Sequence, residues 1–237
     1  MRDQAHADGP EHEPSLVGNT FDSVPAGAAF AVRLGARAAR VNRTSELPMS
    51  DVAWDLMQSW IDAVRARALG YRLDFWDGPF PGELAGDAAA FHHMVQAKPR
   101  DDLHLVDVIL HADHVVELDR ALVEAGRQRW TIFVRDVSGR CVGGTEVTFE
   151  SWDPAVAVQQ NTAIDQAHRG LGLAKWAKAS MLDRIRRERP DVERVCTSNA
   201  FSNAPMLAIN TALGFKIIEA RTEWQGQTAD LRRALPA

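Results

Sequence analysis

The chain has 237 residues, of which 46% are hydrophobic and 25% are charged, and its formal net charge is −5. This composition is sufficient for a hydrophobic core, and the acidic balance argues against a general nucleic-acid-binding protein. The sequence lacks both the roughly 20-residue apolar stretch of a membrane-spanning helix and the apolar core of an N-terminal signal peptide. We therefore expect a cytoplasmic protein whose partner is a small molecule, with no nucleic-acid or membrane partner.

The first 70 residues divide into a tail and a short structured segment. Residues 1–20 mix His, Pro, Asp, Glu and Gly without apolar periodicity, so they are predicted to form a disordered tail. The stretch from Phe21 to Leu47 indicates a helix, a glycine stop and a strand. Apolar residues at helical spacing from Asp51 to Leu69 predict an amphipathic helix. We interpret residues 21–70 as an N-terminal segment with a linker helix, and residues 71–237 as the main domain.

The main domain is predicted to be a mixed sheet flanked by helices, which is an α/β (α+β) fold. Strands are expected where polar and apolar residues alternate, and helices where apolar residues recur every three or four positions. Cys141 and Cys196 fall inside apolar strand-like runs and are expected to be structural. In chain order, the predicted elements are a strand at 71–76, helices at 83–97 and 114–127, a hairpin of strands at 130–137 and 141–149, a strand at 156–164, a helix at 172–189, a strand ending at Asn199 and a helix ending at Leu213.

A glycine-rich loop, Arg169-Gly170-Leu171-Gly172-Leu173-Ala174, joins a predicted strand to a predicted helix. Glycine allows close approach to the backbone, and the first turn of a helix leaves N–H groups without internal partners. Together with the helix dipole, these groups favour a phosphate or pyrophosphate site. The loop alone is a weak indication, because a tight turn into a helix has the same composition.

The order of strand, loop, amphipathic helix, strand and second helix gives the loop more weight. Here the sequence resembles the GCN5-related N-acetyltransferase (GNAT) superfamily. The pyrophosphate loop of that family has Arg or Gln, two free positions, Gly, one free position, then Gly or Ala. Arg169, Gly172 and Ala174 occupy the three specified positions, and residues 203–215 are similar to the second cofactor helix. The resemblance, firm over about residues 130–224, implies the GNAT fold, acetyl coenzyme A as cofactor and acetyl transfer, usually to an amine.

The N-terminal segment contains a second similarity. An apolar helix ends at Leu34-Gly35 and another ends at Leu213-Gly214, and a strand follows each. This resembles the end of a preceding acetyltransferase repeat, as in tandem members of the superfamily. The alternative is coincidence, since glycine commonly follows a helix. Such a remnant would expose apolar surface if it stood alone, so we expect it to pack on a neighbouring sheet, in cis or through a homodimer.

The resemblance also implies a set of cofactor-binding residues. The loop backbone would hold the pyrophosphate, and the strand before the loop would pair with the pantetheine arm. The side chains of Arg169 and Lys175 either contact phosphate or belong to a solvated basic face. Asn203 stands where the family commonly has a cofactor-contacting asparagine, and it is also placed to cap a helix. The expected set is Thr162, Ala163, Ile164, Arg169, Gly170, Leu171, Gly172, Leu173, Ala174, Asn199 and Asn203.

Two residues are candidates for the chemical step. Glu146 lies on the strand next to the cofactor strand and is the first choice as general base, with Glu150 second. The alternative for both is an acid on the solvent face of a strand. Many family members have a tyrosine that protonates the leaving thiolate where this chain has Asn210. An amide has no titratable proton, so Asn210 is expected to hydrogen-bond the sulfur or a water while the thiolate leaves unassisted or through water.

Three further patterns are weighed against plainer explanations. The acidic pair 101–102 either attracts a cationic amine or is loop surface. Asp107, His111 and His114 have metal-ligand spacing, but the stretch also contains strand-like residues, and no metal is expected. The basic helix at 175–189 suggests DNA binding, but its apolar stripe favours a solvated face.

The sequence therefore favours an acetyl-coenzyme-A-dependent N-acetyltransferase that acts on the amine of a small molecule. The alternative is a non-catalytic acyl-coenzyme-A-binding domain, a degenerate half of a tandem protein. A third class, a DNA-binding regulator, depends on one basic helix. The identity of the acceptor depends on loops whose shape the sequence does not define.

Overall fold

The computed structural model describes residues 15–97, 101–104 and 109–234. Its strands are β1 (Ser15–Phe21), β2 (Arg37–Pro48), β3 (Arg72–Asp77), β4 (Arg127–Arg135), β5 (Cys141–Glu150), β6 (Asp153–Ile164), β7 (Arg194–Ala200) and β8 (Lys216–Gln227). Its helices are α1 (Pro25–Arg33), α2 (Trp54–Arg67), α3 (Gly82–Gln96), α4 (Ala112–Glu124), α5 (Leu173–Glu188), α6 (Ala204–Leu213) and α7 (Thr228–Ala234), with short 3-10 turns at Met49–Asp51 and Gln166–His168.

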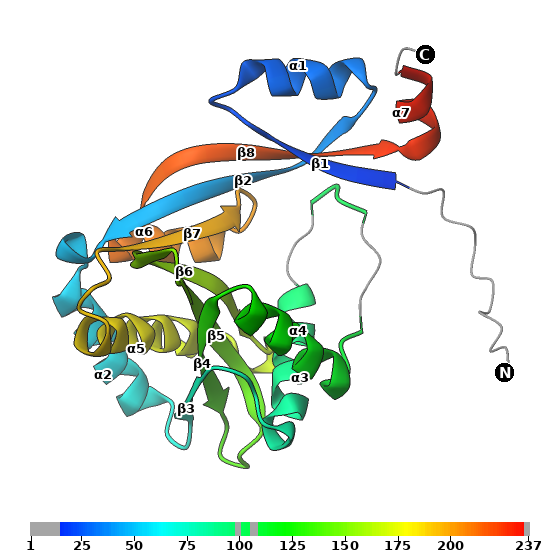
Figure 1. Ribbon diagram of the computed structural model, residues 1–237. Helices are drawn as coiled ribbons and strands as arrows, with labels where there is room; N and C mark the ends of the chain where they lie inside the picture. Colours follow the sequence, from blue (N-terminus) through cyan, green and yellow to red (C-terminus); the bar gives the residue numbers. More distant parts are fainter. Residues whose placement is uncertain (1–14, 98–100, 105–108, 235–237) are drawn as a thin grey trace, which may run out of the picture.

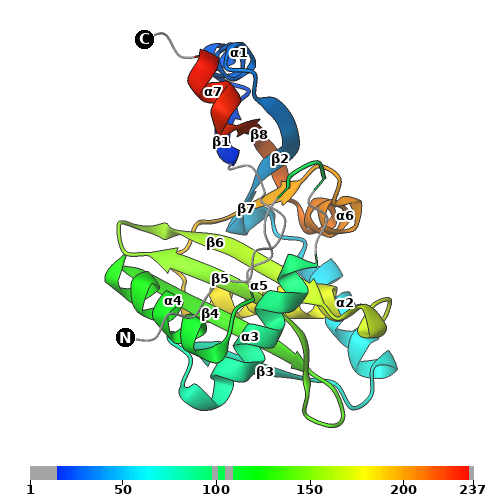
Figure 2. The ribbon, with the colours of Figure 1, turned by 90° about the vertical axis from the view of Figure 1, so that its right-hand side faces the viewer.

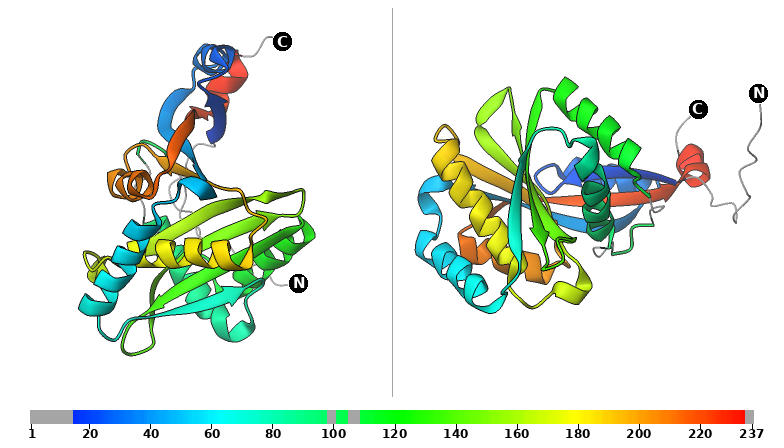
Figure 3. Two further views of the ribbon diagram at one scale, coloured as in Figure 1. Left: turned by 90° about the vertical axis from the view of Figure 1, so that its left-hand side faces the viewer. Right: turned by 90° about the horizontal axis from the view of Figure 1, so that it is seen from below.

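One eight-stranded sheet runs through the molecule in the order β1-β8-β2-β7-β6-β5-β4-β3 (Figure 1). Strands β6 and β7 pair in parallel, and the other neighbours pair antiparallel. Helices α2 and α5 lie on one face of β3 to β6, and α3 and α4 lie on the other (Figure 3). The predicted mixed sheet flanked by helices is confirmed. Within the described ranges, no helix has the length and apolar character needed to cross a membrane.

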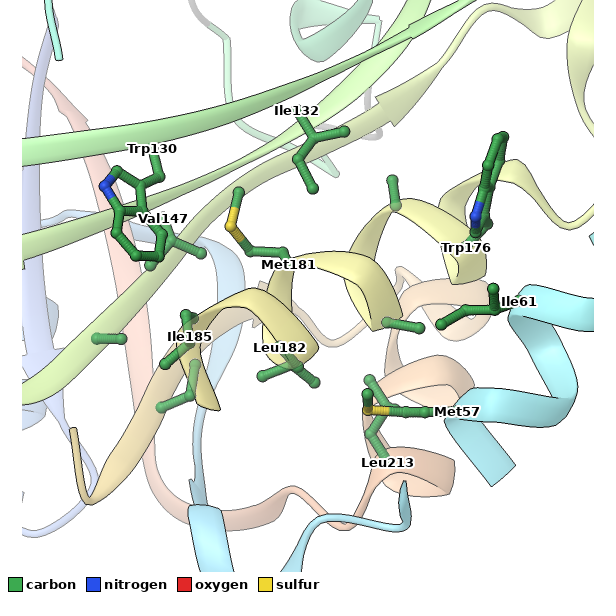
Figure 4. Packing of buried hydrophobic residues seen from close by; sticks show 14 of the residues in the cluster. Met57, Ile61, Trp130, Ile132, Val147, Trp176, Met181, Leu182, Ile185 and Leu213 are labelled. Atoms are coloured by element: carbon green, nitrogen blue, oxygen red, sulfur yellow. The ribbon is translucent and has the colours of Figure 1, made fainter. Parts of the chain in front are cut away.

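Helix α5 lies at the centre of the main hydrophobic core. In Figure 4, Met181 faces the strands that carry Ile132 and Val147, whereas Met57 and Ile61 approach α5 from α2. The core therefore joins the linker helix to the sheet of the main domain. The apolar stripe predicted for this helix, Leu173, Trp176, Ala177, Met181 and Ile185, is confirmed as buried.

One residue of α5 differs from its predicted position. The periodicity places Lys178 on the polar face, but its exposed fraction is only 2%. Its Nζ lies 5.7 Å from the centroid of the Phe215 ring, at the junction of α6 and β8. That junction covers a side of α5 that local periodicity assigns to solvent, so the prediction for Lys178 is wrong.

Most other elements lie close to their predicted positions. The cysteines are free thiols, and burial raises the pKa of the Cys141 thiol to about 11, in agreement with a structural role. The confirmed elements are the linker helix (α2), the first strand of the main domain (β3), the two following helices (α3 and α4), the hairpin (β4 and β5), the cofactor strand (β6), the loop helix (α5), the strand through Asn199 (β7) and the helix ending at Leu213 (α6).

The predicted disordered tail is wrong for residues 15–20, which belong to β1. Ser15–Phe21 pair with β8 from Gln227 back to Arg221. The partner residues lie 200 to 212 positions further along the chain (221 − 21 and 227 − 15), so no local pattern indicates this pairing. Residues 1–14 of the predicted tail lie outside the described residues.

Two segments of the chain share the same order of strand, helix and strand. Ser15 and Arg194 begin β1 and β7, and Arg37 and Lys216 begin β2 and β8. Both pairs are 179 residues apart (194 − 15 and 216 − 37). The pairing follows the same offset, because β1 with β8 and β7 with β2 each form seven matched pairs. The two segments therefore have the same geometry, related by an internal pseudo-twofold.

The predicted similarity between the two helix–glycine–strand segments is confirmed. Gly35 and Gly214 follow α1 and α6 with φ of +77° and +106°, a region that favours glycine. The two segments exchange their second strands, since β2 lies between β7 and β8. The N-terminal segment thus packs in cis, and residues 21–70 share one sheet and one core with the rest of the chain.

The exchange leaves the outer edge of β1 open. Within the described sheet, β1 pairs with β8 alone, whereas its counterpart β7 pairs with both β2 and β6. Leu16 and its counterpart Val195 show the effect, with exposed fractions of 58% and 0%. Figure 2 shows β1, α1 and α7 standing away from the rest of the molecule. An open edge with exposed apolar side chains is a typical site for pairing with another chain.

The homodimer expected through the N-terminal segment stays a prediction, and we expect it to form at this edge. Leu16→Lys should convert the dimer to a monomer, because a charge on an edge strand opposes pairing. Light scattering measures the mass at equal concentrations, and Val137→Lys in the exposed turn between β4 and β5 is the control. A wild-type protein that stays monomeric across the accessible concentration range would contradict this prediction.

Candidate active site

The candidate site opens where β6 separates from β7. The two strands pair only from Val156 to Gln159 on β6 and from Arg194 to Thr197 on β7. Beyond these pairs, β6 continues to Ile164 and β7 to Ala200, so their facing edges have no strand partner in the described sheet. An extended ligand can pair with such an edge through main-chain hydrogen bonds. The open part of β6 includes residues 162–164, which the sequence analysis assigns to the pantetheine arm.

A β-bulge lies at the same point of β6. The register between β5 and β6 shifts around Glu146, so that Gln160 and Asn161 both lie opposite this one residue. A bulge bends its strand and redirects nearby side chains. Asn161 Nδ2 lies 3.3 Å from Glu146 Oε2. The bulge therefore connects the carboxylate of Glu146 with the start of the open strand edge.

The glycine-rich loop follows directly after the open edge. Gly170 and Gly172 both have φ of +82°, which requires a residue that tolerates the left-handed region. Nothing lies within 4 Å of the position that a Cβ on Gly170 would take, whereas a Cβ on Gly172 would lie 3.0 Å from Cγ2 of Val64 on α2. The first turn of α5 leaves backbone N–H groups without helical partners. The loop therefore presents accessible donors of the kind that bind phosphate.

A cavity of about 720 Å³ joins the strand edge, the loop and helices α2 and α6. This volume is within the usual range for small-molecule and cofactor sites. The structure brings most of the predicted cofactor residues together around it. They are Thr162, Ala163, Ile164, Arg169, Gly170, Leu171, Gly172, Leu173, Ala174 and Asn203.

The charged residues in the described cavity lining, Arg and Lys, are all cations. Arg67, Arg169 and Lys175 contribute to it, and its described lining includes no Asp or Glu, although the chain has a net charge of −5. Arg169 Nε donates to the carbonyl oxygen of Ile164 at 3.0 Å and so braces the loop against the end of β6. This charge distribution favours a polyanionic ligand.

The asparagines differ in their relation to the cavity. Asn203 lines it, and its side chain makes no capping hydrogen bond to α6, which leaves the amide free for a ligand. Asn199 and Asn210 are not among the lining residues. Asn210 is buried, and its Nδ2 donates to Oδ1 of Asn199 at 2.7 Å. This bond directs the amide of Asn210 toward β7, so the geometry does not place it at a departing sulfur as expected.

Glu146 lies beside the cavity, outside its lining, in a buried polar cluster with Asp119, Arg129 and Thr131. Its exposed fraction is 3%, and its Oε1 lies 3.8 Å from Nε of Arg129. Another nitrogen of Arg129 lies 2.6 Å from Asp119, and Thr131 stands opposite Glu146 on β4. Asp119 is held by Arg129 and by the backbone N–H of Phe80. Oε1 of Glu146, Nε of Arg129 and Oγ1 of Thr131 have no hydrogen-bond partner within the described structure. Buried polar atoms are nearly always paired, so three together indicate a place for substrate groups or water.

The other acidic candidates form ion pairs. Glu150 ends β5 and pairs with Arg127 at 3.0 Å. Asp102 lies 3.6 Å from Arg37 of the N-terminal segment, and its backbone N–H donates to Ala39. These contacts fit surface and loop-anchoring roles better than attraction of an amine. Glu146 remains the stronger candidate for the base.

The basic face of α5 is also internally paired. Arg186 and Arg187 both bind Asp183, at 2.7 and 3.0 Å, and Arg184 binds Asp77 at 2.7 Å. Guanidinium groups already held by carboxylates are poorly placed to neutralise DNA phosphates. The solvated face expected for this helix is the better description.

The stretch with metal-ligand spacing forms a helix start where the structure describes it. His114 Nδ1 accepts from the backbone N–H of His111 at 3.3 Å at the beginning of α4. Asp107 lies outside the described residues. Among the described residues, no group of three potential ligands comes together.

The lining residues that sequence reasoning missed include Trp60, Arg67 and His168. Trp60 and Arg67 lie on the linker helix, where the apolar spacing indicates core packing only. His168 bonds Tyr71 through Nδ1 at 2.7 Å and Arg140 through Nε2 at 3.0 Å. Since Arg140 can only donate, Nε2 accepts and Nδ1 carries the proton toward the Tyr71 oxygen. No sequence pattern indicates this arrangement, because its members come from three separate turns and loops.

The open mixed sheet, the bulge and the glycine-rich loop define the fold of the GCN5-related N-acetyltransferases. A tandem GNAT protein from the clavulanic acid biosynthesis pathway, solved without acetyl coenzyme A, is 25% identical over 94% of this chain and 65% of that chain, with a TM-score of 0.72. A GCN5-related N-acetyltransferase from Sphaerobacter thermophilus is 11% identical over 92% and 61%, with a TM-score of 0.62. One from Kribbella flavida is 14% identical over 91% and 70%, with a TM-score of 0.55.

The predicted resemblance to the GNAT superfamily, including a tandem member, is thereby confirmed at the level of structure. The chain spans 65% and 61% of the first two of these proteins. No protein-family model and no curated protein sequence matches it. The fold supports an acetyltransferase function in general.

The two loop glycines should respond differently to alanine. Both have φ of +82°, so each substitution should cost about 1 to 2 kcal/mol of backbone strain. Gly172→Ala also brings its methyl 3.0 Å from Val64, whereas Gly170→Ala meets open space. Gly172→Ala should therefore lower the free energy of unfolding by about 1 kcal/mol more.

Urea denaturation of both variants measures this difference. Val64→Ala should reduce the extra cost when it is combined with Gly172→Ala, because it removes the contacting methyl groups. Equal stability of the two single variants would show that α2 does not press on the loop.

Proposed function

We propose that the protein is an acetyl-coenzyme-A-dependent N-acetyltransferase that acts on the amine of a small molecule. The main support is that three features meet at one place. These are an unpaired edge of β6, a loop with accessible N–H groups and a cavity whose charged lining residues are Arg67, Arg169 and Lys175. These features match an extended amide chain that ends in phosphates. The buried cluster around Glu146 adds a polar site next to the same edge.

Different residues around the cavity would bind different parts of the cofactor. The backbone of 162–164 would pair with the pantetheine arm, and Asn203 would face it from the start of α6. The N–H groups of the loop and of the first turn of α5 would bind the pyrophosphate. Acetyl coenzyme A supplies a thioester, whose acyl carbon is attacked by an amine.

Glu146 is the proposed base for that amine. An attacking amine must be neutral, so an acceptor that arrives as an ammonium ion must lose a proton. Arg129 alone would hold the Glu146 carboxylate in an ion pair, but Asp119 lies nearer to the guanidinium, at 2.6 Å against 3.8 Å. Asp119 thus balances most of the Arg129 charge, which leaves Glu146 able to accept a proton directly or through one water.

The alternative function is an acyl-coenzyme-A-binding domain without catalysis. Asn210 favours it, because this residue holds no proton for the leaving thiolate and bonds Asn199 instead. Thiol release from acetyl coenzyme A across a panel of small amines separates the two functions. Binding of the cofactor with no amine-dependent thiol release would favour the non-catalytic domain.

Glu146→Gln should keep cofactor affinity and lower turnover by about a hundredfold to ten-thousandfold, the usual contribution of a positioned base. The wild-type rate should rise with pH through one ionisation, and this ionisation should shift or disappear in the variant. Glu150→Gln is the matched control and should retain the wild-type rate, because Glu150 is paired with Arg127.

Steady-state kinetics over a pH series, with calorimetry for the cofactor, measures both effects. A Glu146→Gln variant with the wild-type rate and pH profile would assign the transfer to positioning of an amine that is already neutral.

A further inference from the structure

The cavity has two ends, and they differ in chemistry. On the side of β6 and α6, its lining includes Thr162, Ala163, Ile164, Ser202, Asn203, Pro205, Met206 and Ile209. Toward α2, its lining includes Trp60 and Arg67, with Lys175 of α5 beside them. The loop between the two ends accounts for a pyrophosphate, and the strand edge accounts for an amide chain. The α2 end is therefore a separate part of the surface, and it presents an aromatic ring and two cations.

We propose that the α2 end binds the 3′-phosphorylated adenosine of coenzyme A, with Trp60 against the adenine and Arg67 and Lys175 on the 3′-phosphate. This inference rests on the proposed function and extends it to a subsite on the linker helix. The nucleotide half of the cofactor is thus bound by a helix that precedes β3, the first strand of the main domain.

The geometry of α2 supports this assignment. Trp60, Ala63, Val64 and Arg67 all line the cavity, and their spacing of i, i+3, i+4 and i+7 places them on one helix face. Val64 is buried, and its Cγ2 lies 3.0 Å from the position that a Cβ on Gly172 would take. This face of α2 is therefore packed directly on the glycine-rich loop. Packing of α2 on the loop therefore fixes Trp60 and Arg67 next to the expected pyrophosphate position.

Lys175 lies at the same end. Its Nζ is 4.9 Å from the centroid of the Trp60 ring, a cation–π contact between α5 and α2. Neither Lys175 nor Arg67 forms an ion pair with a carboxylate of the described residues, unlike the arginines further along α5. Two cations without acidic partners beside a partly exposed indole fit a planar base that carries a nearby phosphate.

The opposite end of the cavity is a poor alternative for the nucleotide. The lining residues of β6, of α6 and of the turn before α6 are hydroxyl, amide and apolar, and Arg169, which contacts this side, already donates to the carbonyl oxygen of Ile164. A phosphate dianion gains more from a cation than from a neutral donor. Since the pantetheine arm pairs with the β6 edge, the adenosine extends from the other side of the pyrophosphate, toward α2.

The test compares coenzyme A with 3′-dephospho-coenzyme A by calorimetry. The wild-type protein should bind coenzyme A at least tenfold more tightly, because the extra phosphate makes charge-assisted hydrogen bonds. Arg67→Gln and Lys175→Gln should each lower the affinity for coenzyme A about tenfold and leave that for the dephospho form unchanged. Arg65→Gln is the matched control, because Arg65 is exposed on the same helix and does not line the cavity.

Trp60→Leu tests the adenine contact. It should lower the affinity for both nucleotides at least fivefold, because a base stacked on an aromatic ring contributes about 1 to 3 kcal/mol. It should not change the affinity for 4′-phosphopantetheine, which lacks the nucleoside. Thermal unfolding of each variant shows whether α2 remains packed.

The outcomes separate the two proposals. A wild-type protein that binds neither nucleotide contradicts the proposed function itself. Equal affinity for the two nucleotides, or full discrimination in both charge variants, overturns the α2 subsite and leaves cofactor binding intact. A Trp60→Leu variant whose loss also appears with 4′-phosphopantetheine assigns Trp60 a structural role and overturns the adenine contact.

Discussion

The separation of β6 from β7 after Gln159 is the constraint on which the candidate site depends. An open strand edge exists there because the bulge at residues 160–161 bends β6 away from its parallel partner. The same bulge lies opposite Glu146, and the bent strand leads directly into the loop that starts α5. One local irregularity thus determines the geometry of the open strand edge, of the loop that follows it and of the Glu146 carboxylate.

The N-terminal segment fixes the position of β7, the strand on the other side of this separation. Strand β7 pairs with β6 through only four residue pairs, but it pairs with β2 through seven. Its position therefore depends more on the N-terminal segment than on the strand beside the cavity. Asp102 contacts the same segment through Arg37 and Ala39. The internal pseudo-twofold is consequently part of the site, although its first half contributes no residue to the cavity.

Sequence patterns predicted the parts of this protein that depend on local order. The apolar stripe of α5, the hairpin and the loop at 169–174 follow from periodicity and from the steric freedom of glycine. The strand exchange was not predictable, because Ser15 meets Gln227 across nearly the whole chain. The burial of Lys178 and the positions of Trp60 and Arg67 at the cavity likewise depend on distant packing. A motif indicated the glycine-rich loop, but only tertiary structure shows what lies around it.

Binding and chemistry have separate physical bases in this molecule. The proposed cofactor site combines the open edge of β6 and the glycine-rich loop with side chains of α2 and α5, and the packing of α2 on Gly172 holds these parts together. The proposed chemical step would depend on one buried carboxylate and on the balance of Arg129 between Asp119 and Glu146. A domain of this kind would keep its cofactor after losing its base. Cofactor affinity and amine-dependent turnover must therefore be measured independently, because the first does not imply the second.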